Sequence, residues 1–139
     1  MSKLTLSRLA KGYFAIQGLS VAMWWIVLLS VPGSREVFFQ ADFLESDFWL
    51  FLIADLVFVA GGSALVAVTW SSAKPWFQPV IWMVVGAVNY ATICTMNLLY
   101  LQQATWIAVI LMLFASAGTT FLAVSKFGAL ESSAANGDS

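Results

Sequence analysis

Residues 48–70 read FWLFLIADLVFVAGGSALVAVTW, a run of 23 residues in which Asp55 is the only charged side chain. At a rise of about 1.5 Å per residue, a helix of this length crosses the hydrocarbon core of a bilayer, which is about 30 Å thick. The run lacks the alternation of apolar and polar residues that is typical of a membrane barrel strand. It therefore predicts a transmembrane helix with a carboxyl group inside it.

Three further apolar runs, at residues 13–31, 79–100 and 104–124, have similar length. The chain is 61% hydrophobic and only 9% charged, whereas about 25% of residues are charged in a soluble domain. These features predict an all-α integral membrane protein, a four-helix transmembrane bundle that forms one domain over residues 1–128. The small polar residues of 129–139 are expected to form a disordered tail.

The distribution of basic residues predicts the orientation of the bundle, because cytoplasmic loops are enriched in Lys and Arg. The first connection holds Arg35 alone, among four acidic residues. The N-terminal segment, the second connection and the C-terminal segment together hold five bases, which are Lys3, Arg8, Lys11, Lys74 and Lys126. We therefore expect four spans with both termini on the cytoplasmic side.

The first connection mixes aromatic and acidic residues in REVFFQADFLESDFW, residues 35–49. Such a mixture is typical of a loop whose aromatic side chains lie at headgroup level, which is the interpretation we favour. The alternative is a short helix that lies in the membrane interface.

Composition excludes several classes of site. The chain has no histidine and one cysteine, Cys94, so it has neither the commonest metal ligand nor an intramolecular disulfide. Its net charge is −1, and no basic stripe suggests a nucleic-acid partner. It also lacks the glycine-rich nucleotide motifs. We therefore predict no metal, no cofactor and no catalytic residue, and we favour a role other than that of an enzyme.

Asp55 is the strongest candidate for a functional residue, because an aspartate at the centre of a membrane helix costs about 2.5–3.5 kcal/mol. The four apolar runs hold no Lys, Arg or His that would neutralise it. Because desolvation disfavours the ionised form, we expect a protonated carboxyl group that faces the bundle interior. Its predicted hydrogen-bond partner is Asn89 or Asn97 on the third helix.

Counting along the runs at about 1.5 Å per residue gives the depth of each polar side chain. Trp24 and Trp25 fall level with Asp55, and Asn89 and Asn97 fall about one turn to either side of it. In NYATICTMNLLY, residues 89–100, the 100° helical period brings Asn89, Thr92, Met96 and Tyr100 to one face. The same count pairs Gln17 with Thr119 and Asn89 with Ser116. The predicted ligand-binding residues are Asp55, Asn89, Asn97, Trp24 and Tyr100, although asparagines in membrane helices also serve as packing contacts.

These observations favour a binding protein for a lipophilic or cationic small molecule, held in an intramembrane pocket around Asp55. One alternative is a non-catalytic helical subunit of a larger membrane complex or a homo-oligomer, because the small residues of FASAGTTFLA, residues 114–123, suit close helix contact. The other is a small acid/base membrane enzyme or a proton-coupled transporter in which Asp55 carries the proton.

The predicted architecture is similar to that of DoxX-like proteins and of the small multidrug transporters. The small multidrug transporters carry a glutamate in the first helix, whereas this chain carries an aspartate in the second. The resemblance therefore concerns the arrangement of helices, and it assigns no family.

Overall fold

The computed structural model describes residues 3–39, 45–72, 74–102 and 104–135, and within these residues all regular elements are helices. The elements are α1 (Lys3–Ser30), α2 (Ser34–Phe38), α3 (Glu45–Ala54), the π-helix η1 (Asp55–Gly61), α4 (Gly62–Thr69), α5 (Phe77–Tyr100) and α6 (Trp106–Ala135). Because α3, η1 and α4 follow one another without a break, they form a single long helix. The predicted all-α four-helix bundle is confirmed.

Within the described residues, four helices are long and apolar enough to cross a membrane, as the sequence predicts: Leu4–Ser30, Phe48–Thr69, Phe77–Tyr100 and Trp106–Gly128. Many of their large apolar side chains point outward, where a soluble protein would have polar groups. Leu19, Val68 and Phe121, for example, are exposed. An outward apolar surface is what a bilayer requires, so the chain is an integral membrane protein.

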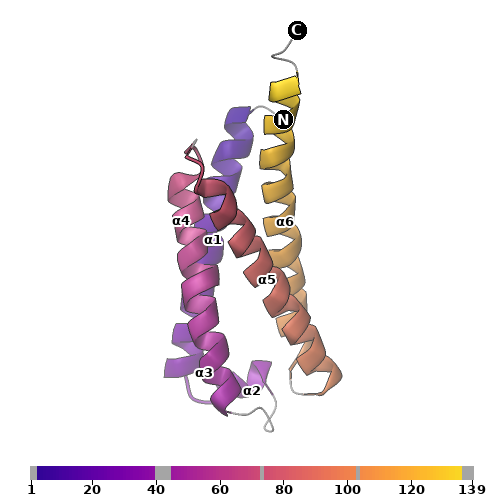
Figure 1. Cartoon of the computed structure of the whole chain (residues 1–139). Coiled ribbons are helices and arrows are strands. Elements are labelled where there is room, and N and C mark those ends of the chain that lie inside the picture. Colours follow the sequence, from indigo (N-terminus) through magenta and orange to yellow (C-terminus); the bar gives the residue numbers. More distant parts are fainter. Residues whose placement is uncertain (1–2, 40–44, 73, 103, 136–139) are drawn as a thin grey trace.

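Successive spans alternate in direction (Figure 1). The start of α1, the end of α6 and the connection between α4 and α5 lie at one end of the bundle, and α2, the start of α3 and the connection between α5 and α6 lie at the other. α1 packs along η1 and α4, and α5 packs along α4 and α6, whereas α1 and α6 touch little. α5 leans away from α4 as it runs toward the α2 end.

Two clusters of buried apolar side chains hold the helices together. The larger includes Phe14 of α1, Val66 of α4, Val84 of α5 and Leu122 of α6, so it joins all four spans. The smaller consists of Trp25, Leu28, Phe48 and Leu52, which belong to α1 and α3. Among the described residues, α5 and α6 contribute nothing to this smaller cluster, because they diverge from α1 and α3 at that end.

Small residues allow the backbones to approach closely in the larger cluster. A Cβ atom added at Gly62 would lie 2.7 Å from Cγ2 of Val84 on α5, and one added at Gly18 would lie 2.9 Å from the carbonyl oxygen of Ala60. Contacts between carbon atoms are most favourable at about 3.5–4.0 Å. Glycine at these two positions therefore permits the observed packing of α1 on η1 and of α4 on α5.

The first connection and the C-terminal segment contain more helix than the favoured interpretation of the sequence. The first connection contains the short helix α2, as in the alternative interpretation of this segment. α2 starts after Gly33, whose backbone has the left-handed conformation with φ 77°. α6 continues to Ala135, so residues 129–135 of the predicted tail are helical in the structure, and the disorder of the tail stays a prediction. This segment has no glycine or proline and includes alanine, leucine and glutamate, which favour helix. The predicted tail at 136–139 and residues 40–44 of the first connection lie outside the described residues.

Candidate functional site

Asp55 is the first residue of the π-helix η1 and lies seven residues after Phe48, where the second span begins. π-helical turns are rare, occur mostly within α-helices and are frequent at functional sites. The wider turn changes the rotation of the residues that follow it about the helix axis. Gly61 and Gly62 lie where η1 returns to the α-helical geometry of α4.

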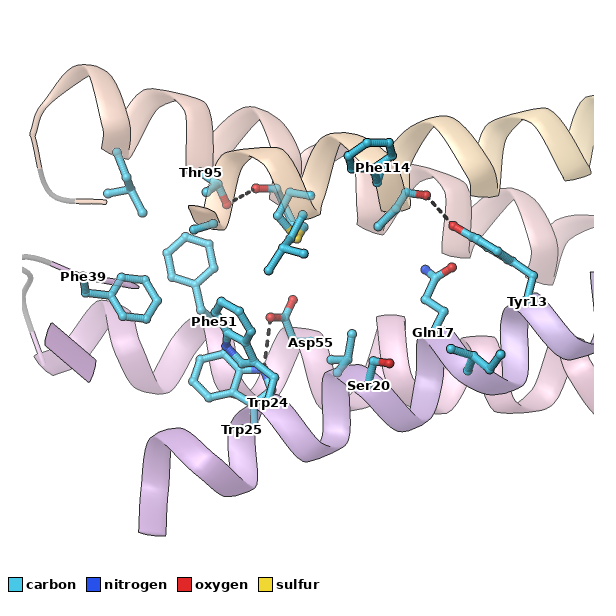
Figure 2. A pocket seen from close by; sticks show the side chains of 18 residues that line it. Tyr13, Gln17, Ser20, Trp24, Trp25, Phe39, Phe51, Asp55, Thr95 and Phe114 are labelled. Atoms are coloured by element: carbon cyan, nitrogen blue, oxygen red, sulfur yellow. Dashed lines mark hydrogen bonds between the residues drawn. The ribbon is translucent and has the colours of Figure 1, made fainter. Parts of the chain in front are cut away.

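The carboxyl group of Asp55 is held by the first span. Nε1 of Trp25 donates a hydrogen bond of 3.1 Å to Oδ2 of Asp55. The indole of Trp25 is only 2% exposed, and it packs edge-to-face on Phe48 with ring centroids 5.1 Å apart. A buried donor in a fixed orientation therefore occupies one carboxyl oxygen, and the other oxygen points toward open space (Figure 2).

This open space is a cavity of about 370 Å³ at the end of the bundle where α5 and α6 diverge from α1 and α3. A volume of this size suits a small organic ligand. Figure 2 shows Asp55 near its middle, with Trp24 and Phe51 beside it and Thr95 and Phe114 on the opposite wall. Its lining is mostly apolar and comprises Tyr13, Ile16, Gln17, Ser20, Val21, Trp24, Trp25, Phe39, Phe51, Asp55, Ala91, Thr95, Leu98, Ala108, Leu111, Met112, Phe114 and Ala115. No Lys or Arg is among these residues of the described chain.

We place the mouth of the cavity between α1 and α6, because lining residues of both helices are exposed. Ile16 of α1 and Phe114 of α6 both line it, yet they are 67% and 75% exposed. Both lie well inside the predicted membrane spans. The mouth therefore faces the hydrocarbon region of the bilayer.

A second polar group lies nearer to the centre of the bundle. The hydroxyl of Thr119 donates a 2.9 Å hydrogen bond to Oε1 of Gln17, and the hydroxyl of Tyr13 donates a 2.8 Å hydrogen bond to the carbonyl oxygen of Ala115. These contacts link α1 to α6 beside the cavity. Nε2 of Gln17 is buried and has no hydrogen-bond partner in the described residues.

Two of the five predicted ligand-binding residues, Asp55 and Trp24, line the cavity. Asn89 faces α6 instead, where its Nδ2 donates to Oγ1 of Thr120 at 3.3 Å and its Oδ1 accepts from the hydroxyl of Ser116. The predicted hydrogen bond from Asp55 to helix α5 is therefore wrong, because Trp25 of α1 is the partner.

Asn97 and Tyr100 lie outside the lining of the cavity. Both are exposed, Tyr100 to 84%. Helix α5 turns the face that carries Asn89 and Thr92 toward α6. Asn97 and Tyr100 lie further along α5, in the part of the helix that leans away from α4. Ligand contacts by Asn89, Asn97 and Tyr100 stay predictions that the position of the cavity does not favour.

The predicted ligand-binding residues do not include Trp25, Gln17 and Tyr13, although counting placed Trp25 at the depth of Asp55 and Gln17 at that of Thr119. For Tyr13 and Gln17 the signal is a spacing: Tyr13, Gln17, Ser20 and Trp24 follow one another at four, three and four residues, and all line the cavity. This spacing places polar and aromatic groups on one face of a transmembrane helix. For polar residues within a membrane span, a shared helix face indicates a site better than the number of such residues does.

The described residues contain no group of three or more His, Cys, Asp and Glu side chains that would hold a metal ion. Comparison of the chain with models of protein families, with curated proteins and with solved structures finds no match. The argument for function therefore starts from the cavity and its polar groups.

Proposed function

We propose that this membrane protein binds a lipophilic small molecule in the intramembrane cavity, and that an amine or another hydrogen-bond donor of the ligand engages Asp55. The observation that carries the proposal is the position of this carboxyl group. Trp25 satisfies one of its oxygens, and the other faces a cavity of about 370 Å³.

The energetics support a ligand at this position. A carboxyl group can make several hydrogen bonds in either protonation state, and the only hydrogen bond of the Asp55 side chain in the described structure comes from Trp25. In an apolar cavity, it is unfavourable in free energy to leave the other hydrogen-bonding positions of the carboxyl group without partners. A cationic or hydrogen-bond-donating group of a ligand would supply the missing partner.

The apolar lining and the mouth support a lipophilic body for this ligand. Because the mouth between Ile16 and Phe114 faces the hydrocarbon region, a molecule dissolved in the bilayer reaches the cavity without crossing water. With both termini cytoplasmic, as the basic residues favour, Asp55 would lie in the half of the membrane away from the cytoplasm.

The alternative role as a subunit of a larger complex rests on the small residues of α6. A Cβ atom added at Gly118 would lie 2.7 Å from the ring of Tyr13, so this part of the small-residue face is already covered within the chain. The cavity, in contrast, is unfilled by any side chain of the described residues. For this reason we favour ligand binding over assembly, and we give Asp55 a binding role.

A test uses the full chain in lipid nanodiscs with ¹⁵N-labelled tryptophan, titrated with n-decylamine. The indole N–H of Trp25 donates to Asp55, so its nuclear magnetic resonance signal reports on the carboxyl group directly. We expect n-decylamine to shift this signal, and we expect Asp55→Asn to weaken the apparent affinity by about 10- to 100-fold, the effect of losing a charge-assisted hydrogen bond.

The matched control is Asn97→Ala, because Asn97 is exposed and lies outside the cavity lining. It should bind n-decylamine as the native protein does. If the Trp25 signal does not respond to n-decylamine, or if Asp55→Asn and Asn97→Ala bind equally well, the proposal is wrong.

A further inference from the structure

Gln17 carries a buried, unpaired hydrogen-bond donor beside the cavity. Its side chain lines the cavity and is only 8% exposed. Thr119 occupies Oε1, but Nε2 has no partner within the described residues. Figure 2 shows the amide of Gln17 directed into the same open space as the free oxygen of Asp55.

A buried amide without a partner is unfavourable. Leaving a donor unsatisfied costs about 1–3 kcal/mol, and the bilayer offers no water to satisfy it at this depth. Gln17 is at the centre of the span Leu4–Ser30, so interfacial water is remote. The unpaired N–H group therefore marks a second point at which a bound molecule gains a hydrogen bond.

The two polar points are separated along the bundle. Trp25 is level with Asp55 because the two are hydrogen-bonded, and Gln17 precedes Trp25 by eight residues in the same helix. Eight residues correspond to a rise of about 12 Å between the Cα atoms of Gln17 and Trp25, or about two helical turns. Apolar side chains such as Val21 and Met112 line the cavity in addition to these polar groups.

We infer that the ligand has two polar groups of different kind: a donor or cation for Asp55 and, across an apolar stretch, a carbonyl or ether oxygen that accepts a hydrogen bond from Nε2 of Gln17. This inference rests on the proposed function and narrows the chemical class of the ligand. A simple lipophilic amine satisfies Asp55 alone. An amine with an ester or amide carbonyl at the far end of its chain satisfies both residues.

The experiment compares two probes of similar size, n-decylamine and the methyl ester of aminooctanoic acid with the amine at the end of the chain. The full chain, labelled with ¹⁵N in tryptophan and glutamine, is titrated in lipid nanodiscs. The side-chain signal of Gln17 is assigned from its loss in Gln17→Met and, independently, from its loss in Gln17→Leu. Both probes should shift the Trp25 indole signal.

Only the amino ester should shift the side-chain amide signal of Gln17. It should also bind about fivefold more tightly than n-decylamine, the effect of one neutral hydrogen bond, and Gln17→Met should abolish this difference. The shift of the Gln17 signal is measured in the native chain, and the variants serve only to assign this signal. Either of the two variants suffices for the assignment if the other folds poorly.

Two outcomes separate the inference from the proposed function. If both probes shift the Trp25 signal with equal affinity and neither moves the Gln17 signal, the second polar point is refuted, and binding at Asp55 stands. If neither probe shifts the Trp25 signal, the proposed function fails, and this inference fails with it.

Discussion

Gly118 of α6 lies against Tyr13 of α1, and this contact determines how closely the two helices approach beside the cavity. A Cβ atom at Gly118 would lie 2.7 Å from Cε2 and from the hydroxyl oxygen of Tyr13, and 2.8 Å from Cζ. Since favourable contacts require about 3.5–4.0 Å, the ring would have to move by about 1 Å. Tyr13 is anchored by its hydrogen bond to the carbonyl oxygen of Ala115, so the movement also weakens this bond.

The expected effect of Gly118→Ala on the free energy of unfolding follows from three contributions. Overpacking destabilises by about 1–3 kcal/mol, and loss of an interhelical hydrogen bond in a membrane protein by about 0.6 kcal/mol. Replacing glycine by alanine within a helix stabilises by about 1 kcal/mol. The net result is a destabilisation of about 0.5–2.5 kcal/mol.

Gly86→Ala is the matched control. Gly86 lies within α5, and nothing would lie within 4 Å of a Cβ atom at this position. Gly86→Ala gains the higher helix propensity of alanine and introduces no steric clash. It should therefore be more stable than the native protein by about 0.5–1 kcal/mol. Both free energies are measured by unfolding in mixed micelles with increasing mole fraction of sodium dodecyl sulfate. Equal stability of the two variants would refute the close contact between Gly118 and Tyr13.

Three further predictions concern the site and the topology. Gln17→Met removes an unsatisfied donor along with the weak bond from Thr119, so the same unfolding assay should show unchanged or higher stability, by up to about 2 kcal/mol; a clear loss would mean that the amide is a structural contact. Trp25→Phe removes the donor to Asp55 and part of a buried ring, and it should lower the free energy of unfolding by about 1–3 kcal/mol; no change in that assay would contradict the hydrogen bond. Reporter fusions in the first and third connections should lie outside, and those in the second connection and at the C-terminus should lie inside; an external C-terminus would overturn the orientation.

The four spans were predictable from sequence because the bilayer demands long uninterrupted apolar helices. Depth was predictable for the same reason, since each residue advances a helix by about 1.5 Å. Trp25 meets Asp55, Thr119 meets Gln17 and Ser116 meets Asn89, and each pair falls at the depth that counting gives. The small residues of α6 indicated close helix contact, and the structure makes such a contact within the chain, through Gly118.

Rotation of the helices about their axes was not predictable from the pattern. Helix α5 directs Asn89 to the hydroxyls of α6 and away from Asp55, because side-chain packing between neighbouring helices sets the rotation. The π-helix that begins at Asp55 changes the rotation of the residues that follow it in the second span. No residue pattern in the sequence predicts this change. The divergence of α5 and α6 that opens the cavity is likewise a property of the packed bundle.

The most direct test of the account is the infrared difference spectrum of the protein on addition of n-decylamine, recorded for the native chain and for Asp55→Asn. Asp55 is the only acidic residue within the four spans, so the substitution identifies its carboxyl bands among those of the acids outside the membrane. We predict that n-decylamine changes a carboxyl band of the native protein and that this change is absent from Asp55→Asn. Identical difference spectra for the two proteins would show that Asp55 does not meet the ligand, and would contradict the account.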